Sequence, residues 1–190
     1  MSAASKLFEA IKRAGRKPTS NVEPTCSIPT VEFDASCVTD AVKADLWKNI
    51  LLLEDIDRNC ADQIYDAAVR SISAGRDLSV LLDALMQLNL SGMTTRRAGE
   101  ISRLLNNRAT ALMNRERQVT LGIKRALWLY SGAPCEIDPK TPTGQDAAHR
   151  ASNGKSFDVS KGMFLNGKWT WPGVEAGCRC ISRSVVPGFS

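Results

Sequence analysis

The longest regular pattern of apolar and polar positions covers residues 93–130. Its apolar residues recur at steps of three and four, which is the spacing of one buried helix face. These positions are Ala98, Ile101, Leu105, Ala109 and Leu112. Thr94 or Thr95 supplies a hydroxyl that can cap the start of the helix. An unbroken helix of this length would be roughly 55 Å long at about 1.5 Å per residue, so we expect Gly122 to bend it or end it.

Three shorter segments with helical periodicity precede this one, between residues 39 and 90. Asp40 is a candidate cap for the first segment, the second stops near Gly75, and Asp77 is a candidate cap for the third. Short loops between helices favour antiparallel neighbours. Together with the long segment, these helices predict an antiparallel bundle.

The pattern changes after Tyr130, where glycine and proline become frequent and helical periodicity stops. Residues 164–169 contain Asn166-Gly167, a pair that supplies the two positive-φ residues of a type I′ hairpin turn. Residues 180–186 are expected to form another short strand. The predicted fold is mainly α: an antiparallel helical bundle with a long basic helix, followed by a small loop-rich β-hairpin appendage. An appendage of about 55 residues has little core, so we expect a cross-link or contact with a neighbouring domain or subunit to stabilise it.

These patterns divide the chain at two places. Residues 1–38 are predicted to form an extended N-terminal arm, because their second half is rich in Pro, Thr and Ser. Such an arm either reaches a partner or a neighbouring subunit, or folds back onto its own domain. Residues 39–133 form the predicted helical domain and residues 134–190 the small β/loop C-terminal domain.

Positive charge is concentrated in the long helical segment. Between residues 94 and 125 there are eight Lys or Arg against two Glu, whereas the whole chain has a net charge of +5. This surface is either a solvated helix face or a contact for an acidic partner, which would be DNA or an acidic protein. The candidate contacts are Arg96, Arg97, Arg103, Arg108, Arg115 and Arg117, with Lys6, Lys12 and Arg13 in the arm.

The C-terminal region contains a set of residues with metal-ligating chemistry. The set is Cys135, His149, Cys178 and Cys180, and His149 is the one histidine of the chain. Tetrahedral zinc takes Cys3His sets of this kind, although the spacing lacks the C-x2-C pairs of common zinc motifs. The alternatives are buried thiols with a hydrogen-bonded histidine, or a disulfide formed in an oxidising medium. Apart from zinc, no cofactor is expected.

The sequence lacks the motifs of common enzymes. One histidine without a Gly-x-Ser-x-Gly elbow argues against a hydrolase triad. Gly154-Lys155-Ser156 is no phosphate-binding loop, because His149 occupies the place of the earlier glycine. We therefore expect no enzymatic activity.

Signals for membrane insertion and secretion are also missing. No apolar run approaches the roughly 18 residues of a membrane helix, and the start lacks the apolar core of a secretory signal. We expect a protein that is made in a cytoplasm and keeps its cysteines reduced.

Short motifs follow one another in the C-terminal half. They are His149-Arg-Ala-Ser-Asn-Gly-Lys-Ser-Phe157, Lys161-Gly162, Trp171-Pro172-Gly173, Cys178-Arg179-Cys180 and Val185-Val186-Pro187, with Trp128 ahead of them. In this order, residues 93–187 resemble the phage head morphogenesis family, the Mu F-like minor head proteins. The chain departs from that family in lacking a His-Pro before Cys178, and in the reduced segment Cys135-Glu136-Ile137-Asp138.

The resemblance implies a structural virion protein of a tailed phage, acting at the portal vertex of the head–tail junction. It would be a head-to-tail connector or a minor head protein, made in the bacterial host cytoplasm. The implied partners are the portal protein, copies of itself in a dodecameric ring, downstream tail or connector proteins, and the packaged DNA, with no membrane. The alternative is a basic DNA-binding protein that acts during genome packaging or capsid assembly.

Overall fold

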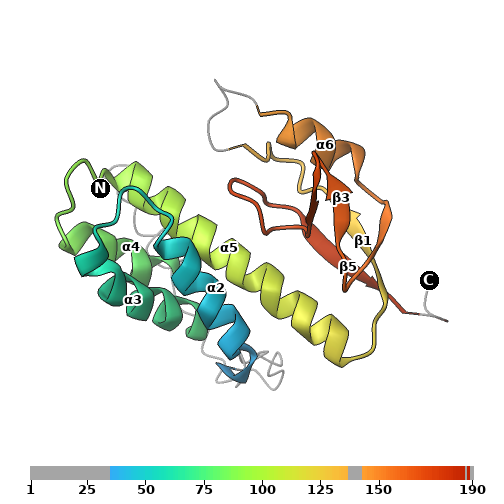
Figure 1. Cartoon of the computed structure of the whole chain (residues 1–190), viewed down its shortest axis with the longest axis horizontal. Helices are drawn as coiled ribbons and strands as arrows, with labels where there is room; N and C mark the ends of the chain where they lie inside the picture. Colours follow the sequence, from blue (N-terminus) through green and yellow to red (C-terminus); the bar gives the residue numbers. More distant parts are fainter. Residues whose placement is uncertain (1–34, 137–142, 187, 189–190) are drawn as a thin grey trace, which may run out of the picture. The chain divides into compact units, whose positions relative to one another are not determined.

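The chain combines helices with two small sheets, as a computed structural model shows (Figure 1). The structure describes residues 35–136, 143–186 and 188, so most of the predicted arm lies outside the described part. About 50% of the described residues are helical and 14% lie in strands. The predicted mainly α fold is therefore wrong, because the C-terminal region forms a three-stranded sheet in addition to the expected hairpin.

The helical part contains four main helices. They are α2 (Asp40–Ile50), α3 (Ala61–Ser73), α4 (Leu78–Gln87) and α5 (Thr95–Thr120), with the short 3-10 turns η1 (Ala35–Cys37) and η2 (Arg58–Cys60). The side chains of Thr39, Asp77 and Thr94 accept backbone N–H groups at the starts of α2, α4 and α5. Such caps satisfy donors that a helix start leaves unpaired. Asp40, the expected cap, is instead the first residue of α2.

One hydrophobic core lies among these helices. Its largest fully buried side chains are Leu46, Ile50, Ile64, Ile72, Leu81, Leu85, Ile101 and Leu105. Burying an aliphatic side chain of this size contributes about 1.5–3 kcal/mol. The apolar stripe of α5 faces α2, α3 and α4 because burial of its side chains in this core stabilises the packed helices. Within the described part of the chain, no helix is long and apolar enough to cross a membrane.

The long helix ends earlier than its periodicity suggested. Residue 120 is the last in α5, and Gly122 follows with φ +71, where the amide of Ile123 donates to the Gln118 carbonyl (2.9 Å). A left-handed residue at this position is a common helix stop, and glycine adopts it without a Cβ penalty. The expectation that Gly122 bends or ends the helix is therefore confirmed, and the helical pattern assigned to residues 121–130 is wrong.

The segment after Gly122 forms the central strand of a sheet. Strand β1 (Arg125–Leu129) pairs antiparallel with β2 (Ser156–Asp158) on one side and with β5 (Ile181–Val185) on the other. Its burial alternates, with Ala126 and Trp128 buried, as expected for a strand covered on one face. The sheet therefore crosses the predicted domain boundary after residue 133, because β1 precedes this boundary and β2 and β5 follow it.

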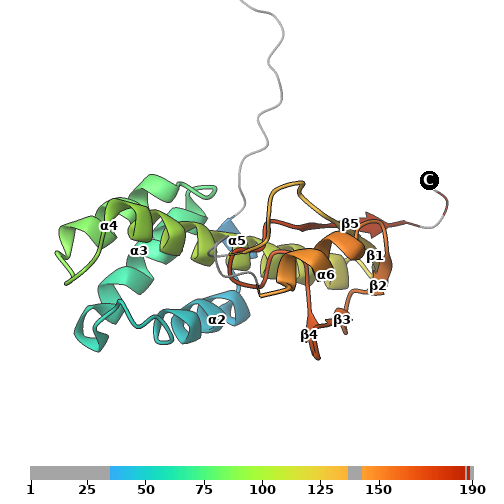
Figure 2. The same ribbon diagram turned by 90° about the horizontal axis from the view of Figure 1, so that it is seen from above.

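The expected hairpin is present, as is the expected last strand. Strands β3 (Met163–Leu165) and β4 (Lys168–Thr170) pair antiparallel around Asn166 and Gly167, which have φ +49 and +80. Helix α6 (Gln145–Ala151) completes the C-terminal part. Figure 2 shows α6 and the strands beside the C-terminal half of α5, away from α3 and α4.

A second hydrophobic core forms under the sheet and contacts α5. Its members are Ala126, Trp128, Cys135, Phe157, Val159, Cys178 and Cys180. Gln118 of α5 donates to the hydroxyls of Ser182 and Ser184 on β5 (3.3 and 3.0 Å). Arg115 lies over the Trp171 ring at 4.1 Å from its centroid. The C-terminal half of α5 is thus fastened to the β part by polar and cation–π contacts.

Candidate metal centre

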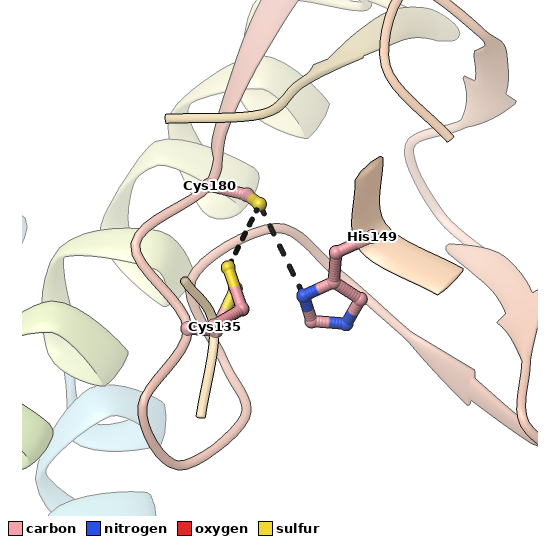
Figure 3. A group of neighbouring side chains, drawn as sticks. Cys135, His149 and Cys180 are labelled. Carbon is pink, nitrogen blue, oxygen red and sulfur yellow. Dashed lines mark hydrogen bonds between the residues drawn. The ribbon is translucent and has the colours of Figure 1, made fainter. Parts of the chain in front are cut away.

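Four residues from three separate segments converge at the second core. Cys135 follows β1, His149 lies in α6, and Cys178 and Cys180 lie in the loop before β5. All four are buried, and their ligand atoms lie within 4.8 Å of one another. Figure 3 shows the sulfurs of Cys135 and Cys180 and the ring of His149 directed toward a common point. The structure therefore brings together all four predicted ligands in a cluster that could hold a metal ion.

The first turn of α6 holds the cysteine segments in place. Asp146 accepts hydrogen bonds from the Tyr130 hydroxyl (2.7 Å) and from the Cys135 amide (2.8 Å). Gln145 donates to the carbonyls of Cys135 and Ala176 (2.7 and 2.8 Å), one on each side of the cluster. These two side chains therefore fix both cysteine-bearing segments relative to the helix that carries His149.

The two ring nitrogens of His149 face different partners. Nδ1 lies 4.0 Å from the sulfur of Cys180, and Nε2 lies 3.6 Å from a carboxylate oxygen of Glu175. The ring is fully buried, and its centroid is 4.9 Å from that of Trp128. Burial opposes protonation, but the polar atoms of the neighbouring Cys135, Cys180 and Glu175 side chains outweigh it and raise the pKa of His149 to about 11.

The three sulfurs are thiols at non-bonded distance. Cys135 and Cys180 have their sulfurs 3.5 Å apart, well beyond the roughly 2.05 Å of a disulfide bond. Hydrogen bonds from Cys178 and Cys180 lower the pKa of Cys135, and the same thiol cluster raises the pKa of Cys178. The Gly173 amide donates to the sulfur of Cys178 (3.2 Å). The cluster thus favours one thiolate, which is the form in which a cysteine binds metal.

Most of the predicted contact arginines form contacts within the protein. Arg97 binds Asp55 (3.0 Å) and Arg96 binds Glu100 (3.0 Å). Arg108 binds Asp45 (2.8 Å) and also donates to the Val174 carbonyl (2.9 Å). Asp55, Asp45 and Val174 link α5 to other parts of the chain, whereas Glu100 lies in α5 itself. Much of the positive charge of the helix is therefore paired within the protein.

The surroundings of Arg115 and Arg117, near the end of α5, differ from each other. The guanidinium of Arg115 donates to the Ser160 carbonyl (3.1 Å) and covers Trp171. Arg117 is exposed, and its side chain contacts no carboxylate among the residues that the structure describes. Lys6, Lys12 and Arg13 lie outside the described residues.

A basic cleft lies between α5 and the cysteine loop. Its volume is about 540 Å³, and its charged lining residues are Arg76, Arg103 and Arg179, without any carboxylate. Arg76 is held by a hydrogen bond to the Asn107 side chain (2.7 Å). Sequence reasoning did not single out Arg76 or Arg179, although the position of Arg179 between two predicted ligands was a usable signal. Glu175 was missed as well, because nothing in the sequence connects it to His149.

Comparisons of the chain with protein-family models, with curated proteins and with solved structures found no match. The function is therefore inferred from the residues and from their geometry.

Proposed function

We propose that this chain is a structural virion protein of a tailed phage whose C-terminal part is held together by one zinc ion. The observation that carries the proposal is the convergence of Cys135, His149, Cys178 and Cys180 in a single buried cluster. Three of these four residues belong to the motifs that resemble the head morphogenesis family. The zinc would take the place of the larger hydrophobic core that so small a β unit lacks.

The donor set fits zinc better than magnesium or calcium. Three sulfurs and one imidazole nitrogen match the Cys3His sets of structural zinc sites, while magnesium and calcium take oxygen ligands. Four protein ligands complete a tetrahedron and leave no open position for a substrate. All four are buried, with Cys180 the most exposed at 3%. We therefore assign the zinc a structural role and expect no enzymatic activity.

The other motif residues support the same proposal by their packing. Trp128 and Phe157 lie in the core around the cluster, with ring centroids 6.3 Å apart. Gly173 of the Trp-Pro-Gly motif packs on α5, where a Cβ would lie 3.1 Å from the side chain of Ala111. The motif series that resembles the family thus corresponds to one folded unit around the proposed zinc.

At the portal vertex, the chain would act as a connector or minor head protein in a dodecameric ring, at the head–tail junction. Its partners would be the portal protein, neighbouring copies, downstream tail or connector proteins, and the packaged DNA. We place the contact with an acidic protein surface at the basic cleft, because Arg103 and Arg179 are exposed and line it without a carboxylate. The exposed side chains of Leu78 and Ile181 add apolar area beside these charges.

The alternative is a DNA-binding protein that acts in packaging, with Arg117 and the same cleft on phosphates. The cleft has no aromatic lining residue on which bases could stack. A protein partner therefore fits it better than single-stranded nucleic acid.

Mixing the purified protein with a portal ring tests the proposed role. Native mass spectrometry should show a fixed number of copies on the ring. The double variant Arg103→Glu with Arg179→Glu should lose this binding, and the control Arg117→Glu, outside the cleft, should retain it. A wild-type protein that ignores the portal but binds DNA, with an affinity that falls steeply with salt, would replace the connector proposal by the DNA-binding alternative.

A further inference from the structure

The side chain of Glu175 lies behind His149, on the side away from the cysteines. One carboxylate oxygen is 3.6 Å from Nε2 of the ring, whereas Nδ1 faces the sulfur of Cys180. Nε2 is buried and has no partner within hydrogen-bond distance among the described residues. A small shift of either side chain would therefore close a hydrogen bond between the carboxylate and the ring.

The geometry of the ring decides which nitrogen can bind a metal. Since Nδ1 points at the thiols, it is the nitrogen available to an ion in the cluster. A neutral imidazole that binds metal through Nδ1 carries its proton on Nε2, and this N–H then needs an acceptor in a buried site. Glu175 is the acceptor in position.

Glu175 is itself held as a carboxylate. Only 8% of its side chain is exposed, and the Lys168 ammonium lies 3.3 Å from its second oxygen. Lys168 also offsets the negative charge that three thiolates and a carboxylate bring to one divalent ion. Lys168 belongs to β4, so this chain of contacts runs from the hairpin to the cluster.

We propose that Glu175 is a positioning residue of the metal centre, which fixes His149 as an Nδ1 ligand, and that Lys168 links the β3–β4 hairpin to the same centre. This inference rests on the proposed zinc site. Carboxylates behind a ligating histidine set the tautomer and raise the basicity of the ring, and losing one typically weakens metal binding by about 10–100-fold.

Zinc competition against a chromophoric chelator tests this role on the full chain. Glu175→Leu, which removes the acceptor, should weaken zinc binding by about 10–100-fold. Glu175→Gln retains an acceptor oxygen and should lose clearly less, and Lys168→Ala should fall between Glu175→Leu and wild type. The matched control is Glu136→Gln, a carboxylate next to Cys135 in sequence without an ion pair to His149.

The ring itself gives a readout that a general packing defect would not change. In ¹⁵N NMR spectra of the zinc-loaded wild type, His149 should show a metal-bound Nδ1 and a protonated Nε2. The Nε2–H signal should shift and exchange faster with water in Glu175→Leu, and Glu175→Gln should largely restore it. Zinc bound through Nε2, or equal zinc affinity in Glu175→Leu and wild type, would overturn the inference while leaving the zinc site intact. A wild type that binds no zinc would instead refute the proposed site.

Discussion

Two tryptophans of the hairpin region have opposite environments. The indole N–H of Trp171 donates to the Val159 carbonyl (2.8 Å), and Arg115 covers its ring. Trp169 is 57% exposed and contacts Phe164 across the hairpin, with ring centroids 5.5 Å apart. The two side chains therefore form a matched pair for mutation.

We expect Trp171→Ala to lower the free energy of unfolding by about 3 kcal/mol, because it removes a large packed ring together with its hydrogen bond. Trp169→Ala should cost less than about 1 kcal/mol, the range of one exposed cross-strand pair. Urea unfolding of both variants with zinc present gives the comparison. Equal costs would mean that the ring of Trp171 is not packed against α5 as described.

The protonation of the cluster predicts how zinc binding depends on pH. The pKa of His149 is raised to about 11 and that of Cys178 is also raised, so both hold protons at neutral pH without metal. Zinc must displace these protons, which means that the zinc-free form binds more protons than the zinc-bound form. Lowering the pH therefore favours the zinc-free form.

Three protons leave on zinc binding, one from His149 and one from each of the two cluster cysteines that are still thiols, so the apparent dissociation constant should rise by about 1,000-fold for each pH unit of acidification. Chelator competition at several pH values between 6 and 8 measures this slope. Cys37→Ser, which removes a thiol outside the cluster, should leave it unchanged. An affinity independent of pH would contradict the described protonation.

The β3–β4 hairpin depends on a close approach between the backbone at Gly162 and that at Thr170. Gly162 has φ +84, and a Cβ there would lie 2.5 Å from the Thr170 carbonyl oxygen. Gly167, in the turn, has a similar φ of +80, but a Cβ there would meet nothing within 4 Å. Both positions disfavour an L side chain, and only Gly162 adds a steric clash.

Gly167→Ala should therefore cost about 1–2 kcal/mol, the penalty of a left-handed residue with a Cβ. Gly162→Ala should cost clearly more, because the β3–β4 pair must move to accommodate the methyl group. Thermal unfolding of the two variants measures the difference. A smaller cost at Gly162 than at Gly167 would show that the hairpin does not pack as described.

Local chemistry explains which elements could be predicted from sequence. The hairpin follows from Asn166-Gly167, whose turn preference needs no tertiary contact. Strand β1 was missed because its buried residues, Ala126 and Trp128, continue the apolar pattern of the preceding helix. A pattern over five residues does not distinguish a helix from a strand. Gly122 was the signal from which a bend or an end of the long helix was predicted. The pairing of β1 with β2 and β5 depends on long-range contacts that one sequence does not display.

The candidate site was predictable to a similar degree. Residue chemistry identified Cys135, His149, Cys178 and Cys180, although their separation gave no indication that they would meet. The role of Glu175 depends on the direction of the His149 ring, which only the structure gives. The basic residues were harder to interpret from sequence. Counting charges did not reveal that Arg97 and Arg108 form ion pairs with Asp55 and Asp45 within the protein.

Two separate hydrophobic cores determine the expected behaviour of the whole molecule. The helical core ends at Met113 of α5, and the second core surrounds the cluster of three cysteines and His149. The second core is small and contains three of the four proposed ligands, so its stability should depend on zinc, as it does in other small metal-bound units.

Chelation should therefore unfold the C-terminal part and leave the helices largely intact. We expect the fluorescence of the buried Trp128 to shift to longer wavelength while most of the far-ultraviolet helical signal is retained. Adding zinc back should restore both signals. Simultaneous loss of the two signals, or no change in either, would contradict a separate zinc-dependent core.

The mass of the purified protein under native conditions is the most direct test of the proposed zinc site. We expect one zinc ion per chain, which is lost in Cys178→Ser and retained in Cys37→Ser. A metal-free chain with free thiols, or a chain lighter by two hydrogens because two of the cluster cysteines have formed a disulfide, would contradict the zinc-held C-terminal part.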